Sequence, residues 1–245
     1  MSLALVKCVR IFVVEQLREP IGIFWSFAAP IAWLILTAPV DSGPYLSAEL
    51  YVDRAAWCLA YIALFVAATG FGLYLVGRRE SGFVRSFLNS PARRGRFLMA
   101  QYLASMIMAL GYGLAFLAIT SYTLTDIGMA PLLLLLAKYT LTVACFMFAA
   151  IFIAALPLTF RSASSIMSVF MTIAVVAGVA SQAARAAPNP VLLYMNPFCA
   201  AAHFMSDAIA EAMVVPVLAA QVLLSAVLGA YGLWRLRINP EWSSR

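Results

Sequence analysis

Six stretches of about 20 or more predominantly apolar residues dominate the sequence, and charged residues are almost confined to the segments between them. An α-helix of this length crosses the hydrocarbon core of a bilayer. The stretches lack the alternation of apolar and polar residues that a membrane β-barrel needs, so helices are the predicted spanning elements. The six predicted transmembrane helices are residues 21–40, 55–77, 97–122, 131–156, 166–184 and 214–234.

The composition excludes a soluble protein. Of the 245 residues, 64% are hydrophobic and 11% are charged, against about 45–50% and about 25% in soluble domains. So few charges cannot keep a water-exposed surface of this size dispersed. The six spans leave no room for a sizeable soluble domain. The sequence therefore predicts a single all-α transmembrane domain over residues 1–245.

The distribution of basic residues indicates the orientation. Because cytoplasmic segments are enriched in Lys and Arg, both termini are expected in the cytoplasm, with the chain in the inner or plasma membrane of the cell. Membrane topology thus accounts for the net charge of +6, and no basic surface remains that would indicate nucleic-acid binding. The basic residues on the side of the N-terminus are Lys7, Arg10, Arg18, Arg78, Arg79, Arg85, Arg93, Arg94, Arg96, Arg161, Arg235, Arg237 and Arg245.

Residues 1–20 are expected to form an amphipathic helix along the inner membrane surface. At about 100° per residue, its charged residues occupy one half of the helix and its apolar residues the other. The apolar face would enter the lipid headgroup region. The helix serves either as a topological anchor or also as a contact for a cytoplasmic partner. Its charged residues are Lys7, Arg10, Glu15, Arg18 and Glu19.

The segment 78–96, between the second and third spans, is predicted to fold into a short helix over 82–88 that Asn89 ends. Ser90 then caps a second helix with Pro91 at its first position, where no backbone donor is lost. That helix continues into the third span. The alternative is a solvated basic loop that only fixes topology. The turn and cap signals favour a compact cytoplasmic element that docks on a partner.

The outer segment 185–213 is apolar, and Asn196-Pro197 within it indicates a helix start. The expected helix, 198–213, lies in the outer interface or re-enters the membrane before the sixth span. His203, Asp207 and Glu211 would share one face of it. A metal site is disfavoured there, because three ligands on one exposed helix face rarely converge on one ion.

Two features of the spans leave alternatives open. Lys138 lies within the fourth span, where its stem can extend to the outer surface or its ammonium can face the bundle interior. Cys58 and Cys199 both lie toward the outer side. Sequence alone does not establish that they are close enough to form a disulfide, and a role as small apolar residues is the simpler interpretation.

No catalytic or phosphate-binding motif is present. A P-loop needs Lys followed by Ser or Thr, and the two lysines, Lys7 and Lys138, precede Cys8 and Tyr139. The spans also lack the internal carboxylates that proton-coupled carriers use. The chain is therefore expected to be non-enzymatic and without a cofactor, and any ATP-driven work must use Mg-ATP bound by a separate subunit.

Three short motifs, in this order, resemble the permease subunits of ABC-2 type transporters, which have the type V exporter architecture. Arg18-Glu19-Pro20 leads into the first span. Glu80-Ser81-Gly82, Leu88, Ser90-Pro91 and Arg93-Arg94 follow the second span. Asn196-Pro197-Phe198 precedes the outer helix and the sixth span.

The resemblance implies that 80–88 forms a coupling helix that docks on a separately encoded ABC ATPase. It also implies a smaller contact at Arg161, an outer gate helix starting at Asn196, Pro197 and Phe198, and a second permease chain, identical or related. The ATPase-coupling residues would be Glu80, Ser81, Gly82, Arg85, Leu88, Pro91, Arg93 and Arg161.

The cargo is expected to be apolar or amphipathic: a drug, a lipid or a peptide. The resemblance implies aromatic channel linings in polysaccharide exporters, and Phe170 is the one aromatic residue of the fifth span. A polysaccharide or glycolipid exporter of the same family is the first alternative. An ATPase-independent facilitator or assembly protein is the second.

Overall fold

The computed structural model describes residues 3–37, 46–81, 91–183, 195–207 and 211–235. Every regular element in this part of the chain is a helix, so the predicted all-α fold is confirmed. Five helices are long and apolar enough to span a membrane, and a bent pair is a sixth candidate. The five are Ala48–Glu80, Ala92–Leu124, Met129–Ala155, Phe160–Ala180 and Val215–Arg235, and the pair is Leu3–Leu17 with Pro20–Leu36.

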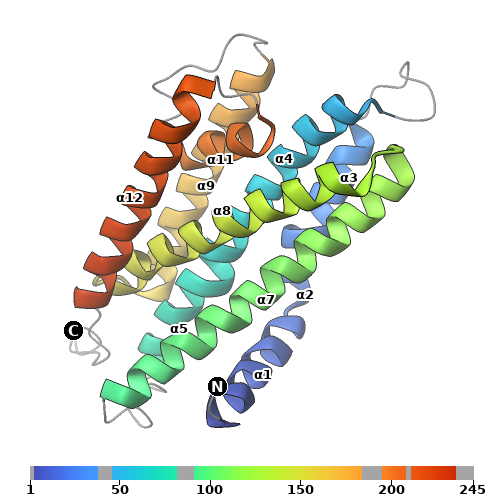
Figure 1. The fold of residues 1–245 in the computed structure, drawn as a ribbon. Coiled ribbons are helices and arrows are strands. Elements are labelled where there is room, and N and C mark those ends of the chain that lie inside the picture. The colour runs from blue at the N-terminus through green and yellow to red at the C-terminus, as the bar shows by residue number, and fades with distance from the viewer. Residues whose placement is uncertain (1–2, 38–45, 82–90, 184–194, 208–210, 236–245) are drawn as a thin grey trace.

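The helices form an elongated bundle around one central helix (Figure 1). That helix consists of α4 (Ala48–Phe65), the π-helical η3 (Val66–Leu73) and α5 (Tyr74–Glu80). Its alanines at 55, 56, 60 and 63 are fully buried, and small residues of this kind let neighbouring helices approach closely. The surrounding helices are α7 (Pro91–Leu124), α8 (Met129–Ala155), α9 (Phe160–Ala183) and α12 (Glu211–Arg235).

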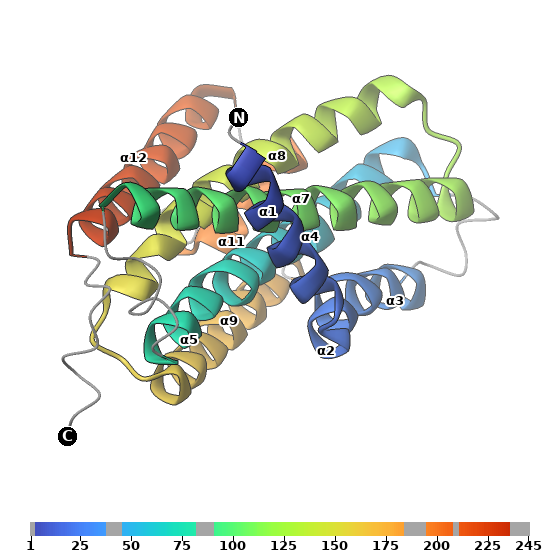
Figure 2. The same ribbon diagram turned by 90° about the horizontal axis from the view of Figure 1, so that it is seen from below.

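The N-terminal helix α1 (Leu3–Leu17) is bent by 79° from the helix that follows it. It lies across the bundle near α7 (Figure 2). Phe12 is buried, with its ring edge-on to Phe97 at 5.5 Å and to Tyr74 at 6.0 Å between ring centres. The expectation that the apolar face meets lipid is therefore wrong for Val9 and Phe12, which are buried in the bundle.

The first span is short and irregular. It comprises α2 (Pro20–Ile23), the π-helical η1 (Phe24–Ala28) and α3 (Ala29–Leu36). Ser26 in η1 donates a hydrogen bond to the Gly22 carbonyl at 2.6 Å. Thr69 in η3 likewise donates to the Phe65 carbonyl at 2.7 Å. Both π-helical segments therefore carry a hydroxyl that bonds to the preceding turn, and π-helical turns are frequent at functional sites.

On the outer side, α11 (Pro197–Met205) packs against α4 and α9. The predicted continuous helix 198–213 is wrong, because the chain leaves the helical conformation after Met205. Asp207 has a φ of 56°, a left-handed conformation that Asp tolerates better than most residues. His203, Asp207 and Glu211 therefore do not share one helix face. Most of α11 is buried against protein, which does not fit an apolar face immersed in the outer leaflet.

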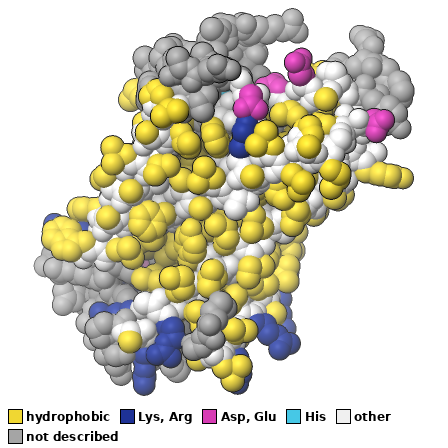
Figure 3. Space-filling view, viewed as in Figure 1, with side chains coloured by type: hydrophobic (Ala, Val, Ile, Leu, Met, Phe, Trp, Pro, Cys, Tyr) yellow, Lys and Arg dark blue, Asp and Glu magenta, His cyan; other side chains and the backbone are white. Residues whose placement is uncertain are grey.

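Charged side chains gather at the two ends of the molecule (Figure 3). In this view most of the coloured Lys and Arg side chains lie at the end that contains α1 and the start of α7. The coloured Asp and Glu side chains lie at the opposite end beside one basic side chain, and a broad belt of hydrophobic side chains separates the two ends. Several helices carry large exposed apolar side chains, such as Ile107, Leu134, Ile173 and Leu223. We call the basic end the inner end and the acidic end the outer end.

Candidate functional site

The last turn of α5 fixes the segment between α8 and α9. The Arg79 guanidinium donates to the carbonyls of Ala154 and Leu156 at 2.7 Å each, and also to that of Leu158. α8 ends at Ala155, and the final carbonyls of a helix have no partner within the helix. A cation is favoured at a helix C-terminus, and a guanidinium can donate to several acceptors at once. Arg79 therefore ties the end of α8 to the central helix.

Glu80 performs the complementary role at the start of α9. Its Oε2 accepts a hydrogen bond from the backbone nitrogen of Phe160 at 2.6 Å. Phe160 is the first residue of α9, so this amide is among the donors that a helix N-terminus leaves unpaired. A carboxylate is favoured there. We call Arg79, Glu80 and the backbone groups that they bind at 154–160 the inner clamp.

The same turn of α5 also holds the N-terminal helix. Arg78 forms an ion pair with Glu15 of α1. The Tyr74 hydroxyl donates to the same carboxylate, and the Arg78 guanidinium lies 4.8 Å from the centre of the Tyr74 ring. Glu15 was expected on a charged face open to solvent or to a cytoplasmic partner. It contacts the bundle instead, so α1, α8 and α9 all attach to one turn of α5.

The structure brings some of the predicted coupling residues together. Glu80 lies against the start of α9, where the exposed Arg161 is the next residue after Phe160. The Ser81 hydroxyl donates to the Arg78 carbonyl at 3.1 Å. α7 begins at Pro91, and Arg93 lies exposed in its first turn. Gly82, Arg85 and Leu88, together with the predicted helix 82–88, lie outside the described residues.

Sequence reasoning did not identify Arg79 or Glu15 as structural residues. The sequence pattern indicates only that Arg79 contributes to the topology and Glu15 to the charged face of an amphipathic helix. Arg79 binds backbone carbonyls, which have no signature in the sequence, at positions 75 to 79 residues away. The available signal was the cluster Arg78-Arg79-Glu80 at the end of an apolar helix, where opposite charges meet the ends of neighbouring helices.

The predicted outer residues lie where α11 contacts α4 and α9. The Asn196 Oδ1 accepts from the backbone nitrogens of Phe198 and Cys199, which caps α11. The Asn196 Nδ2 donates to the Ala174 carbonyl of α9 at 2.9 Å. The Phe198 ring is edge-on to Trp57 of α4, with 5.4 Å between ring centres. Asn196, with Pro197 and Phe198, therefore anchors α11 between two spanning helices.

The structure places Lys138 beside the segment that follows α11. Its side chain is only 13% exposed, and the ammonium forms an ion pair with Asp207, which is 69% exposed. The ammonium also lies 5.7 Å from the centre of the Phe204 ring.

Two other predicted outer residues lie near Trp57 or in α4. The His203 imidazole is edge-on to Trp57. Burial lowers the pKa of His203, and the charge of Asp53 raises it in part. Cys58 donates to the Pro30 carbonyl, and no disulfide joins Cys58 to Cys199.

Asp207→Asn is expected to lower the unfolding free energy by about 1 kcal/mol, because the mostly buried Lys138 ammonium loses its counter-ion while solvent screens the pair only in part. Asparagine tolerates the left-handed backbone, so the change isolates the charge. Thermal unfolding of the purified protein measures the effect. Asp126→Asn, at another exposed outer carboxylate, should leave the melting temperature unchanged. Equal shifts in the two variants would contradict the role of the ion pair.

The family of the chain follows from its similarity to known proteins. The sequence model of ABC-2 type transporters matches residues 4–210, which is most of the chain. The chain belongs to the ABC-2 type transporter family. Protein McbE of Escherichia coli is 31% identical over 179 residues, which cover 71% of this chain and 73% of McbE. The permease is thus a multi-pass membrane protein, the transmembrane component of a transporter. Permeases of this family generally act as dimers with a separate ATPase.

Proposed function

We propose that the chain is the permease subunit of an ATP-binding cassette exporter and is driven by a separately encoded ATPase. The observation that carries this proposal is the inner clamp. The segment 80–93 joins α5 to α7, and the turn of α5 from which it departs also holds α1, α8 and α9. A force applied to 80–93 would therefore reach five elements of the bundle together, which is what rigid-body movement of packed helices requires.

The proposed orientation places the basic end in the cytoplasm, in accord with the enrichment of Lys and Arg in cytoplasmic segments. Segment 80–93 and Arg161 then face the compartment that contains ATP. The contact with the ATPase is assigned to Glu80, Ser81, Gly82, Arg85, Leu88, Pro91 and Arg93, with Arg161 as a smaller second contact. The Mg-ATP is bound by the partner, and this chain supplies no catalytic group.

A second permease copy is proposed to complete the transport path. α9 exposes a row of large apolar side chains, which are between 41% and 64% exposed. In a bilayer this row can pack against lipid or against another helix, and packing two such faces would enclose a path between the two permeases. The row consists of Ile166, Val169, Phe170, Ile173 and Val176.

A polysaccharide or glycolipid cargo is the second candidate, and one observation favours it. A cavity of about 230 Å³ lies between η1, α3, α4, α9 and α11. Aromatic rings stack well on sugar faces. The fifth span contains Phe170 as its one aromatic residue, whereas several aromatic residues from other helices line this cavity. The apolar or amphipathic cargo stays the first proposal, because the remaining lining is aliphatic apart from Cys58. The aromatic residues are Trp25, Trp33, Trp57, Tyr61 and Phe198.

The test is co-purification of the tagged permease with the ABC ATPase encoded beside it. The complex is expected to form, and Glu80→Lys is expected to abolish the dependence of ATPase activity on the permease, because it reverses the charge at the proposed contact and at the cap of α9. Glu80→Gln keeps an acceptor for the Phe160 amide and should retain most of the activity. Both are measured as ATP hydrolysis by the complex in lipid nanodiscs.

Glu49→Lys supplies the matched control, because Glu49 is an exposed carboxylate in the first turn of α4 at the outer end. It should leave complex formation and ATP hydrolysis unchanged. A permease that never co-purifies with an ATPase, even when the two are co-expressed, would support the ATPase-independent facilitator or assembly protein and refute the exporter.

A further inference from the structure

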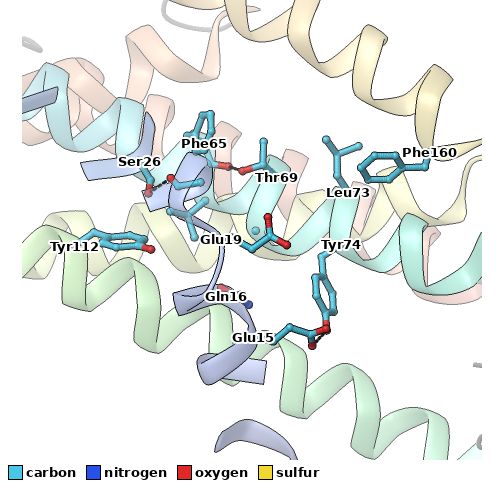
Figure 4. Close-up of a pocket in the computed structure, with 13 residues that line it drawn as sticks. Glu15, Gln16, Glu19, Ser26, Phe65, Thr69, Leu73, Tyr74, Tyr112 and Phe160 are labelled. Atoms are coloured by element: carbon cyan, nitrogen blue, oxygen red, sulfur yellow. Dashed lines mark hydrogen bonds between the residues drawn. The ribbon is translucent and has the colours of Figure 1, made fainter. Parts of the chain in front are cut away.

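A partly polar cavity of about 270 Å³ lies at the elbow between α1 and α2 (Figure 4). α1, α2, η1, the central helix and α7 all contribute to its wall, and Phe160 closes one end. It lies between the two π-helical segments, η1 and η3, and beside the Tyr74 that contacts Glu15. It therefore occurs toward the inner end of the molecule, next to the turn that carries the inner clamp.

The charge in this cavity is negative. Glu15 and Glu19 both line it. The charge of Glu15 is balanced by Arg78, whereas Glu19 has no ion-pair partner within the described ranges. Figure 4 shows the Glu19 carboxylate directed into the space between Thr69 and Tyr74. Glu19 is exposed, and an opposite charge close to it would stabilise its ionised form.

A cluster of polar residues lies behind the lining. The Gln16 Nε2 donates to the Ser105 hydroxyl at 3.1 Å, and Ser105 donates to the Gly70 carbonyl at 3.1 Å. Gln101, which is fully buried, donates to the same carbonyl at 3.2 Å. The Gln101 Oε1 has no hydrogen-bond partner in the part of the chain that the structure describes. Of these residues, Gln16 and Gly70 line the cavity and Gln101 and Ser105 do not, so the cluster holds the Gln16 amide at the cavity wall.

The remaining lining suits an apolar body. Val66 and Leu73 supply aliphatic surface from η3, and the rings of Phe65 and Tyr112 flank it. Aromatic rings also attract cations through their faces. An anion would meet the Glu19 carboxylate, and a neutral apolar chain would leave Glu19 without a counter-ion. The chemistry that suits both Glu19 and the apolar and aromatic lining is a protonated amine attached to an apolar body.

We infer that this cavity binds the cationic end of an amphipathic amine, with Glu19 as its counter-ion, and that this amine is the cargo taken from the inner side of the membrane. The inference rests on the proposed function in one respect, because it calls the bound amine a cargo. Binding itself needs neither ATP nor a partner subunit.

The test is equilibrium binding of dansylcadaverine, a fluorescent primary amine, to the full-length permease in nanodiscs, with empty nanodiscs as the background. Fluorescence polarisation is the readout. Its N-acetyl derivative, which has lost the charge, is the matched ligand. The amine is expected to bind about tenfold or more tightly than the acetylated form, because a charge-assisted contact is lost. Glu19→Gln should weaken binding of the amine by a similar factor and leave the acetylated form unaffected.

Two controls separate the cavity from general effects of charge and of folding. Glu49→Gln removes an exposed outer carboxylate and should leave binding of the amine unchanged. Gly22 lines the cavity, and a Cβ there would meet only the Glu19 Cβ, at 3.7 Å, so Gly22→Leu is expected to occupy the cavity without a backbone clash. It should abolish binding of both ligands, whereas Gly111→Leu, at a position with open space around it, should not.

Equal binding of the two ligands would show that the cavity accepts apolar groups, such as the acyl chains of the bilayer, and would overturn the inference. The inference would also be overturned if Glu19→Gln bound the amine as tightly as the unmodified permease, or if the unmodified permease did not bind the amine at all. The measurement contains no ATPase, so each of these results would leave the proposed exporter function standing. Failure of the permease to co-purify with an ATPase would in turn leave the binding result standing.

Discussion

Arg79→Ala is expected to lower the unfolding free energy by about 2–4 kcal/mol, because it leaves the carbonyls at the end of α8 without their charged donor. The three acceptors belong to Ala154, Leu156 and Leu158. Arg79→Lys should recover only part of the loss, since an ammonium cannot reproduce the fork of a guanidinium. Thermal unfolding in detergent, followed by size-exclusion chromatography with fluorescence detection, measures both variants.

Arg96→Ala is the matched control for Arg79. Arg96 is an exposed arginine in the early turns of α7 at the same end of the molecule. Each of the two variants therefore removes one positive charge from the inner end. Arg96→Ala is expected to leave the melting temperature nearly unchanged. A comparable loss in both would mean that charge at the inner end, and not the inner clamp, stabilises the permease.

Gly232→Ala is expected to destabilise the permease by about 1–3 kcal/mol, because an added methyl group in a tight interface forces backbone shifts. A Cβ at Gly232 would lie 2.8 Å from the Ile151 carbonyl carbon and from the Phe152 backbone nitrogen. Backbone atoms of α8 cannot move aside as a flexible side chain can, so α12 must shift away from α8. Thermal unfolding of the purified variant measures the change.

Gly111→Ala provides a control of opposite sign. Gly111 lies in the interior of α7, and an added Cβ would meet nothing within 4 Å. Alanine is more favourable than glycine in a helix interior by about 0.8–1.0 kcal/mol, so this variant should be neutral or more stable. Destabilisation of equal size at both positions would be inconsistent with the close packing of α12 on α8.

The spans were predictable because the length of an apolar run decides whether a helix can cross a bilayer. The helix ends were less so. The central helix begins at Ala48 and not at residue 55, because Ser47 accepts from the Leu50 amide and caps it. Glu49 and Asp53 lower the hydropathy of those first turns, so a search for apolar runs starts too late.

Contacts between distant segments account for the other differences. α9 begins at Phe160 and not at residue 166, with Glu80 capping it from another helix. The break after Met205 depends on the left-handed backbone of Asp207, which pairs with Lys138. Local sequence carries the signals for apolar length and for the cap at Asn196. Partners supplied by backbone groups far away in the chain have no such signal.

The length of α7 has a mechanical consequence. Its 34 residues run without interruption from Pro91 to Leu124, which corresponds to about 51 Å, against about 30 Å for the hydrocarbon core. A stiff rod of this length amplifies small rotations: pivoting it by about 10° around its midpoint displaces each tip by about 4 Å. A modest push at Pro91 would therefore swing Leu124, on the far side of the bilayer, by more than the diameter of a water molecule.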